Sequence, residues 1–271
     1  MDPISIQRAV IMLQRITVIT SLQGGAGKST LAAGLAYGFS LRGEKTILFD
    51  LNPLSATDDM LLESDSRSPF HLGDVAEGRC TLRDAVFPCP TNGKGALSVV
   101  QPSPDPSATP TERNLLHWLE LSCFEYDRIV VDIPWHSSCF SAVASRAGTT
   151  LVVTEATRYG TLCCDRLRTS PRGQSIRNPR LVLNRFHRKH FWGVGAFRDL
   201  DQAIDSCGLQ LIAVIPDDPR LQHHIPKNME LIRDYQQQLF RQKEFGGTIA
   251  LHCLTDRLLG KRVPLRDLDR L

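Results

Sequence analysis

A glycine-rich segment that leads into Lys-Ser-Thr constrains the fold of this 271-residue chain more than any other feature. The segment follows directly on a β-branched run at 16–20. Glycines let backbone N–H groups turn inward on phosphate oxygens, a lysine meets the β- and γ-phosphates, and a hydroxyl binds Mg²⁺. The run 29–41 is typical of a helix, and its positive N-terminal end would point at the same phosphates. We therefore predict a phosphate-binding loop, rather than a plain turn, with these nucleotide-binding residues: Gly24, Gly25, Ala26, Gly27, Lys28, Ser29 and Thr30.

Apolar runs and helical patterns alternate along the chain. Strands are predicted over 16–20, 46–50, 97–100, 129–132, 150–154, 181–184 and 211–215. Helices are predicted over 29–41, 82–87, 113–121, 137–147, 161–169, 197–207 and 248–259, and the proline-rich segment 101–111 is predicted as a loop. The apolar runs are continuous, which is typical of strands buried on both faces. The pattern predicts an α/β fold, a mainly parallel, doubly wound sheet with helices on both faces.

Length and composition favour a single nucleotide-binding domain, because a chain with 42% hydrophobic residues can bury one large core. We place the domain at 15–260, with an N-terminal extension at 1–14 and a C-terminal tail at 261–271. The eight cysteines lack paired Cys-x-x-Cys spacing, and the first residues do not resemble a signal peptide. The expectation is a cytoplasmic protein with reduced thiols and no membrane-spanning helix.

Two aspartates end predicted strands and are candidates for a metal site. Asp132 closes the run 129–132 and is followed two residues later by a proline, at the position where a carboxylate can hold Mg²⁺ opposite the phosphate-binding loop. Asp50 closes the run 46–50 and is a second candidate for the metal and its water shell. An aspartate at a strand end can also simply form a turn or cap a helix. The presence of the phosphate-binding loop favours the metal role for Asp132, together with Ser29.

Five separated motifs resemble the MinD/ParA group of deviant Walker P-loop ATPases, in the same order and at similar spacing. They are Gly24–Ser29, Asp50–Pro53, Asp132–Pro134, Leu181–Arg185 and Val214–Pro219. The resemblance spans roughly residues 15–259 and implies the fold of this SIMIBI class of P-loop proteins, with ATP and Mg²⁺ as cofactors. It further implies that Asn184, with Arg185 beside it, contacts the adenine, and that the loop at Pro216 and Asp217 lies against the base. Within that group the chain resembles the MinD-like members that place division, flagellar, pilus or cellulose-secretion machinery, and the sequence does not single out one of them.

Two positions depart from the pattern of that family. The family has a lysine at the position of Gln23, which reaches across an ATP-sandwiched dimer, so the resemblance implies only a weak ATP-dependent homodimer here. The family also has a second aspartate at the position of Asn52, which orients the attacking water. An amide cannot take up a proton, and losing a positioned general base costs roughly 10²- to 10⁴-fold in rate. With Lys28, Asp50 and Asn52 as the candidate catalytic residues, we expect slow hydrolysis.

Positive charge is concentrated in residues 158–198, which contain ten Arg or Lys and one acidic residue, Asp165. This net +9 stands against a net charge of +3 for the whole chain. Such a segment is typical of a surface that contacts DNA, an anionic membrane or an acidic protein, although a solvated arginine-rich surface has the same composition. We therefore expect nonspecific DNA or membrane contact through 158–198, and a location in the cytoplasm, peripheral at the inner membrane or at a cell pole.

These observations favour an ATP-dependent spatial or assembly regulator that is part of a larger protein assembly. A first alternative is a nucleotide-bound scaffold that does not hydrolyse ATP and serves a bacterial cellulose-synthesis or secretion complex, which Gln23 and Asn52 favour. A second alternative is a metabolic P-loop transferase of the dethiobiotin synthetase type. That function requires a substrate pocket of convergent polar groups, for which the sequence gives no signal.

Overall fold

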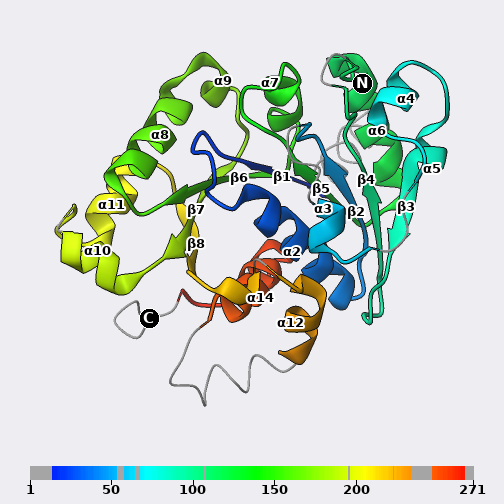
Figure 1. The fold of residues 1–271 in the computed structure, drawn as a ribbon. Helices are drawn as coiled ribbons and strands as arrows, with labels where there is room; N and C mark the ends of the chain where they lie inside the picture. Colours follow the sequence, from blue (N-terminus) through cyan, green and yellow to red (C-terminus); the bar gives the residue numbers. More distant parts are fainter. Residues whose placement is uncertain are drawn as a thin grey trace.

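The computed structural model describes residues 14–53, 58–64, 68–105, 108–194, 196–221, 223–232 and 246–265. In these ranges one eight-stranded sheet has the strand order β3-β4-β2-β5-β1-β6-β7-β8 (Figure 1). All neighbouring strands are parallel except β3, which pairs antiparallel with β4 at one edge. The strands are β1 Ile16–Thr20, β2 Lys45–Asp50, β3 Val86–Cys89, β4 Ala96–Val100, β5 Arg128–Asp132, β6 Thr149–Glu155, β7 Pro179–Phe186 and β8 Leu211–Pro216. The predicted α/β fold class is confirmed.

Helices cover both faces of this sheet. They are α2 Lys28–Leu41, α3 Asp58–Leu61, α4 Leu72–Ala76, α5 Leu82–Ala85, α6 Glu112–Glu125, α7 Phe140–Ala144, α8 Arg158–Thr169, α9 Pro171–Gln174, α10 Arg188–Val194, α11 Leu200–Cys207, η1 Pro219–Leu221, α12 Ile225–Leu231 and α14 Gly247–Leu258. One core cluster joins the sheet to α2, α12 and α14, and two others join the opposite face to α6 and α7 and to α8 and α11 (Figure 1). The central strands are therefore buried on both sides, as their continuous apolar runs predict.

The register of the central strands brings their carboxyl ends together. Asp50 of β2 pairs with Asp132 of β5, and Asp132 also pairs with Ile19 of β1. The phosphate-binding loop leaves the end of β1 and enters α2. Ligands of open parallel sheets bind outside the carboxyl ends of the strands. This arrangement therefore places the predicted site residues where such ligands bind.

The structure corrects one predicted helix and shortens two others. The segment predicted as a helix at 82–87 is helical only to Ala85, and Val86–Cys89 forms the edge strand β3. Pro88 lacks an N–H group and cannot continue a helix, whereas an edge strand tolerates proline. The helix predicted over 137–147 is limited to α7 at Phe140–Ala144, and the one predicted over 197–207 begins at Leu200, after the N-cap Asp199. The short helices α3, α4, α9, α10 and α12 were not predicted, because four to seven residues are too few for a helical period to be recognised.

The proline-rich segment is a loop over its described residues, as predicted. All eight cysteines are free, and only Cys80 is not fully buried. The described residues of 101–111 contain no helix or strand. None of the helices in the described ranges is both long enough and apolar enough to cross a membrane. The tail from residue 266 onward and the first thirteen residues lie outside the described ranges.

Candidate functional site

The phosphate-binding loop has the backbone geometry that its glycines allow. Gly25 and Gly27 have φ angles of 75° and 84°, in the left-handed region that L side chains rarely adopt. A Cβ at Gly27 would lie 2.3 Å from Asn184 Nδ2, so the close approach of β7 also requires glycine there. The first N–H groups of α2 have no carbonyl partner within the helix, because every helix leaves its first turn unpaired. The loop therefore presents backbone donors and the positive end of the α2 dipole at one place.

Lys28 and Ser29 at the start of α2 both contact Asp132. Lys28 Nζ lies 2.6 Å from Asp132 Oδ1, and Ser29 Oγ donates to Asp132 Oδ2 at 2.6 Å. Lys28 Nζ is also 3.5 Å from Ser29 Oγ. Lys28, Ser29 and Asp132 were predicted to bind phosphate and Mg²⁺. Their side chains are in direct contact, although Lys28 and Asp132 are 104 positions apart in the sequence.

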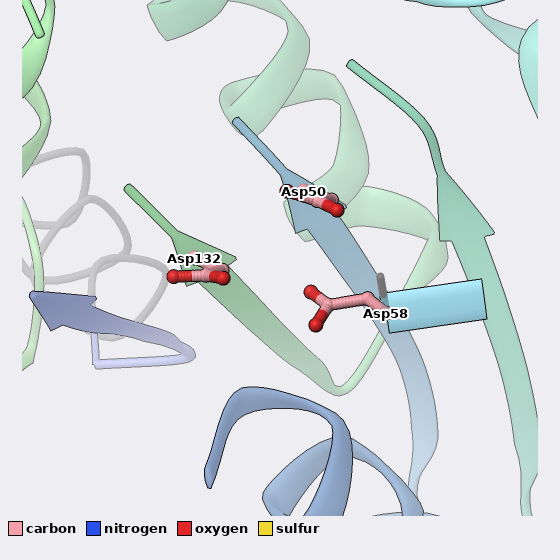
Figure 2. A group of neighbouring side chains, drawn as sticks. All are labelled: Asp50, Asp58 and Asp132. Carbon is pink, nitrogen blue, oxygen red and sulfur yellow. The ribbon is translucent and has the colours of Figure 1, made fainter. Parts of the chain in front are cut away.

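Three buried carboxylates gather beside this contact, and Figure 2 shows how they converge. Asp50 and Asp132 lie at the ends of neighbouring strands, and Asp58 points toward them from the start of α3. One oxygen from each lies within 4.8 Å of the other two, and this is the only group of metal-ligand residues of its kind within the described ranges. Burial, and then the negative charge of Asp132, raise the pKa of Asp50. The hydrogen bond from the Asn52 N–H and the positive charge of Lys28 lower it, but the net shift is upward. A divalent cation would relieve this excess of negative charge.

The donor set of this cluster fits Mg²⁺, which prefers carboxylate and hydroxyl oxygens. Asp132, Asp50 and Asp58 would supply carboxylates, and Ser29 would supply its hydroxyl. Asp58 was not predicted. It follows Asp50 by eight residues and does not end a strand, so the rule that selected the other two aspartates passes over it. The backbone N–H of Asp58 donates to the carboxylate of Asp50, which fixes the start of α3 against the end of β2.

A cleft of about 240 Å³ lies on the other side of the phosphate-binding loop. Four residues that were predicted to contact the base lie in the wall of this cleft: Asn184, Arg185, Pro216 and Asp217. The rest of the wall is formed by Gly25, Gly27, Thr30, Leu31, Asp218, Leu221 and Leu251. The buried Asn184 donates through Nδ2 to the carbonyl oxygen of Ala26 at 2.7 Å. This bond fixes the amide beside the loop and leaves the amide oxygen as an acceptor.

Arg185 separates the cleft from a second cavity. Its φ of 51° is in the left-handed region, which is uncommon for a residue other than glycine. Its Nη1 donates to Gly25 O at 3.3 Å, and the guanidinium lies 3.5 Å from Glu155 and 3.7 Å from Asp217. The second cavity measures about 590 Å³ and is lined by Glu155, Ala156, Thr157, Arg158, Arg185, Phe186, His187, Phe191, Ala196 and Asp217. Nothing in the sequence had indicated this cavity.

The two residues that depart from the family pattern are placed differently. The side chain of Gln23 bonds within its own chain, to Thr154 and Glu155 of β6. Asn52 follows the end of β2, and its backbone N–H donates to Asp50 Oδ1 at 2.9 Å. Position 52 therefore lies beside the carboxylate cluster, and the residue at this position is an uncharged asparagine instead of the aspartate of the family pattern.

The positive charges of 158–198 do not all lie at one end of the sheet. Arg180 and Arg185 lie toward opposite ends of β7. Arg168 forms an ion pair with Asp165 at 2.7 Å, and Arg185 is held by acidic neighbours. Exposed aromatic side chains accompany the cations on two helices, Tyr159 on α8 and Trp192 on α10.

The model of the family described as "CobQ/CobB/MinD/ParA nucleotide binding domain" matches residues 17–232. The septum site-determining protein MinD of Bacillus subtilis is 26% identical over 259 residues, which cover 93% of this chain and 91% of that protein. Among solved structures, a chain of the MinC:MinD cell division protein complex of Aquifex aeolicus is similar with a TM-score of 0.71 and 23% identity, covering 93% of this chain and 99% of that one. MinD of Pyrococcus horikoshii complexed with Mg-ADP has a TM-score of 0.66 and 21% identity, over 91% and 97% of the two chains. The two structural likenesses concern the fold.

Proposed function

Because the chain belongs to the CobQ/CobB/MinD/ParA nucleotide-binding family, we propose that it binds Mg·ATP and acts as an ATP-dependent spatial or assembly regulator. The observation that carries this proposal is the contact of Lys28 and Ser29 with Asp132 beside an open cleft at the carboxyl edge of the sheet. The similar MinD of Pyrococcus horikoshii was solved with Mg-ADP, which supports the same cofactors here. The domain that performs this function is proposed to span 15–260.

Each site residue has a role in this proposal. The ammonium of Lys28 neutralises phosphate oxygens, and the N–H groups of the loop and of the first turn of α2 donate to them. Asn184, Arg185, Pro216 and Asp217 surround the base and sugar in the cleft. Ser29 with the three aspartates would hold Mg²⁺, which when bound offsets the negative charge of the phosphates and of the carboxylates.

Turnover is proposed to be slow because Asn52 stands beside the carboxylate cluster. Its amide can orient a water molecule by hydrogen bonding but cannot accept the proton that the water loses on attack. Asp50 has a raised pKa through burial and through Asp132, and its carboxylate is engaged by the N–H of Asn52. The ATP-dependent homodimer is proposed to be weak, because Gln23 carries no charge and bonds within its own chain.

Two alternatives keep some support. The uncharged residues Gln23 and Asn52 favour a nucleotide-bound scaffold of a cellulose-synthesis or secretion complex, which would need no turnover. The cavity of about 590 Å³ beside the nucleotide cleft supplies the pocket of polar groups that a transferase of the dethiobiotin synthetase type requires. The extent of the match to MinD, over 93% of this chain, favours the regulator. ATP turnover that appears only with an added small acceptor would favour the transferase instead.

A protein partner is the contact that the similar structures favour, since Aquifex aeolicus MinD was solved in a complex with MinC. The positive charges of 158–198, with exposed Tyr159 and Trp192 among them, would provide additional contact with DNA or with an anionic membrane. In this proposal the protein works in the cytoplasm and associates peripherally with the inner membrane or a cell pole through its partner.

The site assignment is tested with Lys28→Ala and a matched control, Lys45→Ala. Lys45 is the first residue of β2, at the end of the strand opposite to the site, and its ammonium lies 4.9 Å from the centre of the Tyr126 ring. Removing the charge-assisted phosphate contact should weaken Mg·ATP binding at least tenfold in titration calorimetry, because such contacts contribute about 1.5–3 kcal/mol. The control should bind as the parent does. Equal affinity for the Lys28 variant and the parent would overturn the assignment.

A further inference from the structure

The side-chain amide of Gln23 makes three hydrogen bonds at the end of β6. Its Nε2 donates to Glu155 Oε2 at 3.0 Å. Its Oε1 accepts from Thr154 Oγ1 and from the backbone N–H of Glu155, both at 3.1 Å. The backbone at Gln23 is held as well, because its N–H donates to Ser21 Oγ at 3.0 Å and its carbonyl oxygen accepts from the same hydroxyl at 2.9 Å.

This environment selects an amide among side chains of similar size. The site needs one donor, for the carboxylate of Glu155, and one acceptor, for two N–H or O–H groups. A glutamate would place a second carboxylate against Glu155, a lysine would leave Thr154 and the N–H of Glu155 without their acceptor, and a methionine would offer neither. Thr154 is 1% exposed, so lost bonds there are not replaced by water.

Glu155 also reaches the far side of the phosphate-binding loop through Arg185. Glu155 Oε1 lies 3.5 Å from Arg185 Nη1, and the same nitrogen donates to the carbonyl oxygen of Gly25 at 3.3 Å. Two points of the loop, Gln23 before the glycines and Gly25 among them, are therefore held by one carboxylate that lies 132 residues away from Gln23.

The start of α8 fits closely against these contacts. A Cβ at Gly160 would lie 2.4 Å from the carbonyl oxygen of Glu155 and 2.9 Å from Gln23 Oε1. The N–H of Gly160 donates to Thr157 Oγ1 at 3.0 Å, which caps the helix at this point. Position 160 must therefore remain glycine for the amide of Gln23 to keep its place.

We propose that Gln23 and Glu155 are positioning residues that hold the phosphate-binding loop in the conformation that accepts phosphate, with Arg185 transmitting the hold to Gly25. This inference rests on the proposed nucleotide binding, but the contacts themselves are independent of it. The residue at position 23 then works within its own chain, through β6, and not as a contact to a second molecule.

The test uses the exchange of the hydrogen-bond partners. Gln23→Glu alone brings two carboxylates together, and Glu155→Gln alone removes the charge that meets Arg185. The double variant with both substitutions restores the three side-chain bonds of position 23, because a carboxylate there accepts from Thr154, from the N–H of residue 155 and from the new amide. It does not restore the ion pair between residue 155 and Arg185. Gln202→Glu is the control, since Gln202 accepts from the N–H of Arg198 at 2.7 Å, away from the site.

Two measurements are made on the full chain. Amide hydrogen exchange without nucleotide should be about tenfold faster at residue 155 and at 24–27 in each single variant. In the double variant the rate at residue 155 should return to that of the parent, whereas 25–27 should stay faster because Arg185 still lacks its carboxylate partner. The rate at which fluorescent Mg·ADP dissociates should rise about tenfold in the single variants and recover in part in the double variant, because the bonds of position 23 return but the ion pair with Arg185 does not. The control should leave both measurements unchanged.

The outcomes separate this inference from the proposed function. A parent protein that does not bind Mg·ADP would refute the proposed function, while the exchange data would still decide whether Gln23 and Glu155 hold the loop. A parent that binds, with single variants whose exchange and dissociation equal those of the parent, would overturn the inference alone. The same holds for a double variant in which the two defects add without recovery.

Discussion

Replacement of Asp58 by asparagine should change stability and metal affinity in opposite directions. Asp58, Asp50 and Asp132 are each at most 2% exposed, and one oxygen from each lies within 4.8 Å of the others. Two unit charges about 5 Å apart interact with about 3 kcal/mol at an effective dielectric of 20, before desolvation is subtracted. Without Mg²⁺, Asp58→Asn removes such repulsion and should stabilise the fold, on the order of 1 kcal/mol.

With Mg·ADP the same variant should lose affinity, because the removed carboxylate faces the place where the cation would lie. Substitution of groups that surround a bound metal typically costs about 10- to 100-fold in metal affinity. Thermal unfolding should therefore show a higher midpoint for the variant in EDTA and a smaller upward shift on adding Mg·ADP. Titration calorimetry gives the affinity directly.

The control for this experiment is Asp165→Asn, which removes an aspartate on α8 that pairs with Arg168 away from the site. It should alter neither the Mg²⁺ dependence nor the affinity for Mg·ADP. Asp58→Asn with parental metal affinity, or with lower stability in EDTA, would show that Asp58 does not belong to a cation site.

Three further predictions concern turnover, acid stability and the basic segment. Asn52→Asp should raise the ATPase rate by roughly 10²-fold or more in a phosphate-release assay, because it supplies a general base, and an unchanged rate would place the base elsewhere. Burial, and then Arg42, lower the pKa of His252 from 6.5 to about 4. Since the unfolded chain binds the proton more tightly, this group's stabilisation is complete above pH 6.5 and should be lost as the pH falls toward 4, by at most about 1.4 kcal/mol per pH unit. Urea unfolding of His252→Gln should show a shallower dependence in this window, and an equal slope would contradict the assignment. If 158–198 neutralises about five phosphates, DNA affinity should fall with salt at a log–log slope of about −4 to −5, and the joint reversal Arg188→Glu and Lys189→Glu should weaken binding to every sequence alike. A gel shift at low salt with ATP that shows no binding would leave a protein or lipid as the partner of the segment.

The central part of the site could be predicted because local sequence determines it. Lys28 and Ser29 must start a helix after a glycine-rich turn, and Asp50 and Asp132 end apolar runs whose carboxyl ends meet in a parallel sheet. Strand ends in such a sheet share one edge whatever the intervening chain does. The base-side residues came from the resemblance, and the structure places all of them in one cleft.

The remaining features depend on contacts that no local pattern encodes. Asp58 enters the carboxylate cluster through the path of the chain after β2, and Glu155 meets Gln23 only because β6 lies beside β1. The predicted helix 82–87 includes the first two residues of the edge strand β3, because four residues with a proline carry too little periodicity to predict a strand. Composition shows that the segment 158–198 is basic, but not where its charges lie in the structure. Arg180 and Arg185, for example, lie toward opposite ends of β7.

The central claim is that the loop, the cleft and the carboxylate cluster bind a Mg²⁺-nucleotide. The most direct test is titration calorimetry of the parent protein with ADP, once in Mg²⁺ and once in EDTA. Saturable binding of one nucleotide per chain, tighter in Mg²⁺ than in EDTA, is the predicted result. No saturable binding in Mg²⁺, or an affinity that is the same in both buffers, would contradict the claim.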